Sequence, residues 1–82
     1  MKITVRLFGR YKDIAGKEKV ILDIIGGNTV GDIVDVFVRQ YPVIENDKKR
    51  IMVLKNKMYV SYDTLYDEGD EISLAPPVVS GG

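Results

Sequence analysis

Residues 29–41 carry one stripe of apolar side chains, and the rest of the chain must supply a surface that covers it. Apolar residues recur at the spacing of a single helix face, at Val30, Ile33, Val34, Phe37, Val38 and Tyr41. Thr29 is placed to cap this helix, Asp32 to complete a capping box and Pro42 to end the helix. A helix with one apolar face is stable only when that face packs on another layer, and the pattern favours a sheet.

The segments on either side of the helix alternate in the way that half-buried strands do. In residues 2–8, Ile3, Val5 and Leu7 share one face, and Phe8 is the exception on the polar face. Val20, Leu22 and Ile24, and later Ile72 and Leu74, continue the inward set. Four further strands are expected at residues 17–24, 51–54, 58–61 and 71–75, with a short helix at 10–15 closed by Gly16 and a tight turn at 55–57. This order predicts an α+β fold, a ubiquitin-like β-grasp with a mixed four- to five-stranded sheet and one main helix.

Length and composition limit the chemistry that the chain can perform alone. At 82 residues it is expected to form one small domain that buries roughly 60 to 65% of its unfolded surface, which leaves little room for a pocket. It has no cysteine and no histidine, which removes thiol nucleophiles, disulfides and Cys/His metal sites, and no metal site is expected. Acidic and basic residues balance, so nucleic-acid binding is not expected. No apolar run reaches membrane-spanning length and no signal sequence is evident, so we expect a cytoplasmic protein that does not bind membranes.

The sequence finishes with an extended segment that carries two glycines. Pro76 and Pro77 cannot donate to a sheet ladder, so they should end the last strand and project the remaining residues away from the sheet. The five residues after Pro77 can span about 17 Å, and Gly81-Gly82 has no Cβ to clash with a narrow channel. We therefore expect a β-grasp domain at residues 1–75 and an extended Gly-Gly tail at residues 76–82.

These features occur together in one known group of proteins. Four blocks of residues carry the likeness: Val5 to Phe8, the hairpin around Asn56, the segment Glu68-Gly69-Asp70-Glu71-Ile72, and Pro76-Pro77-Val78 with the terminal Gly81-Gly82. Over essentially its whole length the chain resembles the small, sulfur-carrying subunits of molybdopterin synthase in the MoaD/ThiS group of ubiquitin-like proteins. Many members have one small residue between Pro-Pro-Val and Gly-Gly. Here Val79 and Ser80 make the tail one residue longer.

The resemblance implies a chemical role for the terminal carboxylate, which is a poor electrophile at neutral pH because it is ionised. A ubiquitin-activating-like adenylyltransferase would use ATP and Mg²⁺ to form an acyl-adenylate at Gly82, and a sulfur donor would convert Gly82 to a thiocarboxylate. The tail (Val78, Val79, Ser80 and Gly81) would enter the large subunit of molybdopterin synthase and deliver sulfur to cyclic pyranopterin monophosphate. The chain would bind no cofactor and would be a non-catalytic subunit, since the catalytic side chains belong to the large subunit in a heterotetramer.

A partner would need a docking surface beside the tail. Phe8, Tyr59, Ala75, Pro76 and Pro77 are the candidate interface residues, because an apolar cluster beside the tail exit suits protein association. The acidic residues 63–71 can be read as a solvated loop or as a docking surface for a basic patch, and residues 48–50 as an exposed turn.

Two other functions use the same tail, and a third does not need it. Gly82 could be joined to lysines of other proteins, as in a ubiquitin-like modifier, or the chain could be the sulfur carrier of the thiamin pathway. The thiamin-pathway carrier is generally shorter and lacks the Pro-Pro exit. A purely structural interaction domain would be indifferent to loss of Gly82.

Overall fold

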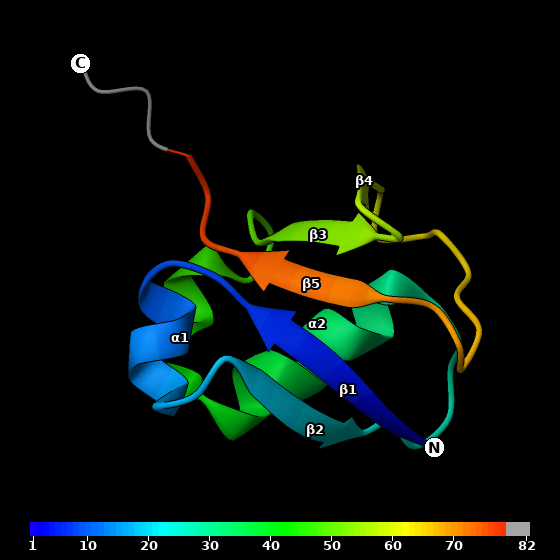
Figure 1. Cartoon of the computed structure of the whole chain (residues 1–82), viewed down its shortest axis with the longest axis horizontal. Helices are drawn as coiled ribbons and strands as arrows, with labels where there is room; N and C mark the ends of the chain where they lie inside the picture. The colour runs from blue at the N-terminus through cyan, green and yellow to red at the C-terminus, as the bar shows by residue number, and fades with distance from the viewer. Residues whose placement is uncertain (79–82) are drawn as a thin grey trace.

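The structure is a computed structural model, and it describes residues 1–78 of the 82-residue chain. Figure 1 shows the fold from one side. The elements occur in the order β1 (Lys2–Leu7), α1 (Arg10–Ala15), β2 (Lys19–Asp23), α2 (Val30–Gln40), the 3-10 helix η1 (Pro42–Asp47), β3 (Met52–Lys55), β4 (Met58–Tyr59) and β5 (Ile72–Ala75).

The strands form one mixed sheet in the order β2-β1-β5-β3-β4. The central pair, β1 and β5, is parallel, with Val5 opposite Ile72 and Leu7 opposite Leu74. The other three pairings are antiparallel. The parallel pair brings the first and last strands of the described chain together at the centre of the sheet (Figure 1). The predicted β-grasp fold, with a mixed five-stranded sheet and one main helix, is therefore confirmed.

Helix α2 begins and ends as its sequence predicts. The Thr29 hydroxyl accepts from the Asp32 N–H at 3.4 Å, and the Asp32 carboxylate accepts from the Thr29 N–H at 3.0 Å, so the predicted capping box is present. These bonds satisfy backbone donors that a helix N-terminus otherwise leaves without a partner. Helix α2 ends at Gln40, two residues before Pro42.

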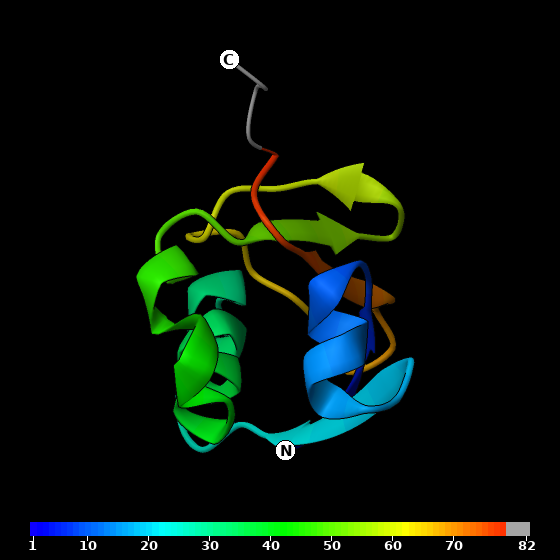
Figure 2. The same cartoon turned by 90° about the vertical axis from the view of Figure 1, so that its left-hand side faces the viewer.

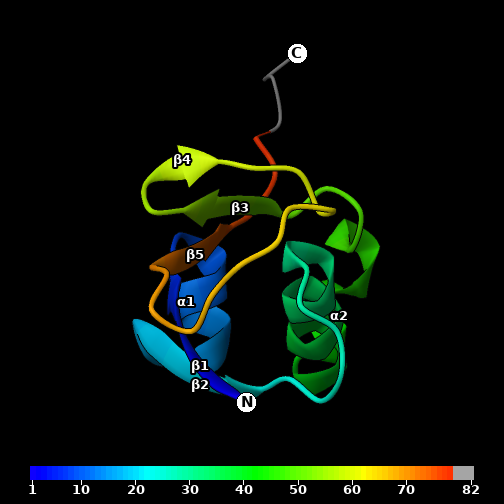
Figure 3. The ribbon, with the colours of Figure 1, turned by 90° about the vertical axis from the view of Figure 1, so that its right-hand side faces the viewer.

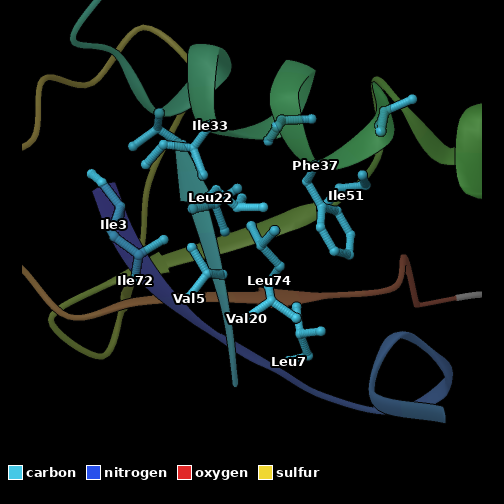
Figure 4. Packing of buried hydrophobic residues seen from close by; sticks show 14 of the residues in the cluster. Ile3, Val5, Leu7, Val20, Leu22, Ile33, Phe37, Ile51, Ile72 and Leu74 are labelled. Atoms are coloured by element: carbon cyan, nitrogen blue, oxygen red, sulfur yellow. The ribbon is translucent and has the colours of Figure 1, made fainter. Parts of the chain in front are cut away.

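The core lies between α2 and one face of the sheet, as Figure 4 shows. Side chains from alternate positions of β1, β2 and β5 meet the α2 stripe, and Phe37 packs near the end of the helix (Figure 4). All the positions predicted to face inward are buried except Tyr41, which is half-buried. The residues that fill the core include Ile3, Val5, Leu7, Val20, Leu22, Ile24, Val30, Ile33, Val34, Phe37, Val38, Ile72 and Leu74.

Two regions depart from the sequence-based expectation. Pro42 ends α2, but the chain then turns into η1, because a proline is tolerated at the first position of a helix, where its missing N–H is not needed. Tyr66 lies in the long connection to β5 yet is buried. Its backbone N–H donates to the Asn28 carbonyl at 3.2 Å, which holds this connection against the start of α2 (Figure 3).

The strand bounds differ from the prediction, since β1, β2, β4 and β5 are shorter and β3 is moved by one residue without a change in length. Side chains take the place of ladder partners at the starts of β3 and β5. The Ile51 carbonyl accepts from the Tyr62 hydroxyl at 2.5 Å, and β3 starts one residue later. The Glu71 N–H donates to the Asn56 side chain at 2.9 Å, and β5 starts at Ile72. The turn between β3 and β4 has positive φ angles at Asn56 (51°) and Lys57 (71°), as a two-residue hairpin turn requires.

The helices of this fold are short relative to the thickness of a bilayer. Within residues 1–78, no helix is long and apolar enough to cross a membrane.

Candidate functional site

The segment that leaves the sheet, residues 75–78, forms the start of the tail, and we call it the tail root. Ala75 is the last residue of β5 and pairs with Met52 of β3. Pro76 and Pro77 have no N–H to continue the ladder, so pairing stops there. Val78 is 80% exposed. Since β5 runs parallel to β1, both strands finish at the same end of the sheet. The tail root therefore leaves the sheet beside the point at which β1 ends and α1 begins (Figures 1 and 2).

The residue predicted to react, Gly82, lies outside the described residues. The same is true of Gly81, Ser80 and Val79, which were predicted to enter a partner. The described part of the site consists of the tail root and its surroundings.

An apolar surface lies beside the tail root on the face of the sheet away from α2. Phe8 comes directly after Leu7, which pairs with Leu74, and its N–H donates to the Leu74 carbonyl at 3.0 Å. The alternation of the strand therefore places Phe8 next to Ala75, and the Phe8 side chain is 44% exposed. Tyr59, which is 66% exposed, pairs with Leu54 at the β4 edge.

Two residues that were not predicted for this surface connect its ends. Met52 pairs with Ala75 and Leu54 pairs with Tyr59, and both side chains are half-buried. We call the set Phe8, Met52, Leu54, Tyr59 and Ala75 the open-face patch. A signal was present in the sequence, because residues 51–54 are all apolar, and a strand with apolar residues at successive positions is covered on both faces.

The acidic residues 67–71 lie at the other end of the sheet, where β5 begins. The Asp70 carboxylate accepts from the Asn56 amide at 3.0 Å and from the Asp67 N–H at 2.7 Å. The hydrogen bond from the Asp67 N–H, and to a smaller extent that from Asn56, lowers the pKa of Asp70. Asp70 thus ties the β3–β4 turn to the start of β5, which gives this carboxylate a structural role.

A buried polar cluster holds α1 against η1. The Tyr11 hydroxyl donates to the Asp47 carboxylate at 2.9 Å, and the Arg10 guanidinium pairs with the same oxygen. Burial, and then the hydrogen bond to Asp47, raises the pKa of the Tyr11 hydroxyl well above its usual value, so it remains a donor. The Tyr11 ring also packs edge-on against Phe37, with ring centroids 5.5 Å apart. Since α1 begins two residues after Phe8, the cluster helps to fix the border of the open-face patch.

Two kinds of known protein, a protein modifier and a sulfur carrier subunit, are similar in sequence to this chain. Small archaeal modifier protein 1 of Haloferax volcanii is 34% identical over 85 residues, covering 94% of this chain and 97% of that protein. Its crystal structure matches with a TM-score of 0.77 at 32% identity, covering 94% of this chain and 98% of that one. The molybdopterin synthase sulfur carrier subunit of Arabidopsis thaliana is 27% identical over 82 residues, covering 100% of this chain and 84% of that protein.

A third comparison concerns a protein solved with its partner. In the complex of subunits 1 and 2 of the molybdopterin-converting factor from Helicobacter pylori, one chain matches with a TM-score of 0.61 and 24% identity, covering 99% of this chain and 100% of that one. At this identity the likeness shows a shared fold.

The family match includes the tail as well as the folded part. The sequence matches the ThiS family over residues 5–82. The relatives divide between sulfur carriers and protein modifiers. With the β-grasp sheet and a match over nearly its whole length, the chain belongs to the ThiS family.

Proposed function

We propose that the chain is the sulfur-carrier small subunit of molybdopterin synthase. The observation that carries this proposal is the position of the tail root, which leaves the sheet directly beside the open-face patch. A partner that covers Phe8 and Ala75 would have the tail root at the edge of the interface, so the tail would enter that partner and not bulk solvent. The Arabidopsis relative is named as a subunit with this role, and the Helicobacter chain was solved in a complex of the corresponding factor.

The proposed chemistry uses the backbone carboxylate of Gly82. The carboxylate attacks the α-phosphate of ATP and releases pyrophosphate, which gives an acyl-adenylate. A sulfide-level donor then attacks the carbonyl carbon, AMP leaves, and Gly82 becomes a thiocarboxylate. In the large subunit the thiocarboxylate sulfur attacks a side-chain carbon of cyclic pyranopterin monophosphate, and a C–S bond forms as the C–O bond at that carbon breaks and the oxygen group leaves. Water then attacks the carbonyl carbon of the resulting thioester. The bond between Gly82 and the sulfur breaks, so the sulfur stays on the pterin and Gly82 returns to the carboxylate. The adenylyltransferase, ATP, Mg²⁺ and the sulfur donor act in the first stage, and the large subunit supplies the catalytic side chains in the second.

Removal of Gly82 tests this proposal. The intact protein, incubated with the adenylyltransferase, ATP, Mg²⁺ and sulfide, should gain the mass of sulfur in exchange for oxygen, as measured by intact mass spectrometry. The chain that lacks Gly82 should gain nothing and should keep the circular dichroism spectrum of the full chain, because the core lies in residues 3–74. Full sulfuration of the pterin by the truncated chain in a purified synthase assay would refute the carrier function.

Gly81→Ala is the milder companion variant. A Cβ at position 81 restricts the backbone and takes up space in a narrow channel, so loading should slow without being abolished.

A second candidate function, protein modification through Gly82, is favoured by one observation. The archaeal modifier is more similar to this chain, at 34% identity, than the Arabidopsis carrier is, at 27%. Proteolysis of proteins from the native cells should then release peptides with Gly-Gly on lysine, and these peptides should disappear when Gly82 is deleted. Cells that lack the protein should lose pterin sulfuration if it is the carrier and lysine conjugates if it is the modifier.

A further inference from the structure

The link between β1 and α1 depends on one glycine with an unusual backbone. Gly9 has φ 59° and ψ −138°, a combination that is essentially limited to glycine. The Tyr11 N–H donates to the Phe8 carbonyl at 3.3 Å, which closes a turn with Gly9 at its first central position. The turn directs the chain from the sheet into α1 directly after Phe8.

The same glycine is in close contact with the tail root. A Cβ built on Gly9 would lie 3.1 Å from the Cγ atom and 3.4 Å from the Cδ atom of Pro76. The first distance is shorter than ordinary carbon contacts, so a Cβ at position 9 would require the proline ring to move by a few tenths of an ångström. Figure 2 shows the start of α1 beside the segment that leaves β5.

We propose that Gly9 is a positioning residue for the tail, which lets Pro76 lie against the start of α1 and so sets the direction in which the tail leaves. This inference rests on the proposed function, since direction matters only if the tail must enter a partner. Pro76 is held from two sides. Ala75 before it is paired in the sheet, and Gly9 beside it is held by the turn. Phe8, bonded through its N–H to Leu74, lies in the same unit. The sheet and the turn thus fix the position of Phe8, the residue proposed to contact the partner, relative to the tail root.

This arrangement predicts how a change in the direction of the tail would affect the formation of the thiocarboxylate. A partner that docks on the open-face patch would still bind a variant with a misdirected tail. The carboxylate would then arrive at the wrong place, and displacement of a reacting group by about 1 Å can lower a rate about 100-fold. The loss should therefore fall on kcat and not on KM.

The experiment measures thiocarboxylate formation by the adenylyltransferase with four variants. We expect Gly9→Ala to lower kcat by about 10- to 100-fold and to change KM by less than about twofold. Gly16→Ala is the control, because Gly16 also has a positive φ, 74°, but a Cβ there meets nothing within 4 Å. Its kcat should equal that of the wild type. Gly9→Ala/Pro76→Ala keeps the backbone strain at position 9 but removes the ring, so its kcat should approach that of Pro76→Ala alone.

A second measurement needs no enzyme and keeps the inference testable if Gly9→Ala folds poorly or if the chain is not loaded. In the free wild-type protein, nuclear Overhauser effects should connect the Gly9 Hα atoms with the Pro76 ring. Residual dipolar couplings of the Val78 N–H should change in Gly9→Ala and stay the same in Gly16→Ala. Absence of the Gly9 to Pro76 contact, unchanged Val78 couplings in a folded Gly9→Ala variant, or an unchanged kcat in that variant would overturn the inference. Failure of the wild type to be loaded, with the contact and the couplings as expected, would count against the proposed function alone.

Discussion

Phe8 is 44% exposed, whereas Leu7 beside it is fully buried in the core. Alternation along β1 separates the two roles, because successive side chains of a strand point to opposite faces. An exposed aromatic residue that lies next to Ala75 of the open-face patch has the properties of an interface anchor. At the scale of single residues, the proposed function therefore requires that Phe8 contribute to binding of the large subunit.

Phe8→Asp should weaken binding of the large synthase subunit by at least about 30-fold, roughly 2 kcal/mol, because a charge is costly to bury within an interface. Thermal unfolding should change little, since the side chain already faces solvent. Isothermal titration calorimetry would measure the affinity. Ile21→Asp is the matched control, because Ile21 is 63% exposed on β2, where it pairs with Thr4. Equal losses in both variants, or unfolding of Phe8→Asp, would contradict the placement of the interface.

Helix α2 contributes most of the apolar surface that covers the sheet, and Phe37 is its largest buried side chain. Phe37→Ala should lower the free energy of unfolding by about 3 to 5 kcal/mol, through lost burial and the cavity left among Tyr11 and Tyr41. Urea denaturation would measure the loss. Gln40→Ala on the exposed side of the same helix is the control and should change the free energy by less than about 0.5 kcal/mol. A wild-type midpoint for Phe37→Ala would contradict the packing of α2.

The start of α2 should respond to acid through Asp32. Hydrogen bonds from the Thr29 backbone and then from its hydroxyl lower the pKa of Asp32 in the folded state. A lowered folded pKa means that the stabilisation is complete above the unfolded value of about 3.9 and is lost as the pH falls through the folded pKa. Asp32→Asn should therefore be less stable than the wild type at pH 7, and the difference should shrink below about pH 4. Unfolding curves at the two pH values would test this, and a difference that does not change with pH would contradict it.

At the scale of the whole molecule, the elements with a strong local pattern were predictable. The α2 stripe, its capping box and the inward residues of β1 and β5 result from periodicity and cap chemistry, which act within a few residues. Met52 and Leu54 were missed because their role depends on the register of β3 against β4 and β5. The buried cluster of Tyr11 and Asp47 joins residues 36 positions apart, a contact that no local pattern encodes.

The candidate site was also predictable only in part. The candidate interface residues Phe8, Tyr59 and Ala75 were chosen from strand alternation and closeness to the proline pair, and the structure places all three on one face of the sheet. The contact of Gly9 with Pro76 was not predicted, because the sequence gives no distance between segments that meet only through the parallel pairing of β1 with β5.

The place of β5 in the sheet also decides the order in which the molecule can be completed. Until Ile72–Ala75 inserts between β1 and β3, the described strands form only two separate hairpins, β1 with β2 and β3 with β4. Pairing across so long a stretch of chain is the slow part of folding for such topologies. The strand that closes the sheet is also the one from which the tail departs. In a newly made chain, the tail root therefore takes its position only in the step that completes the sheet. An activating enzyme that recognises the end of the sheet beside the tail root would then bind folded chains in preference to unfolded ones.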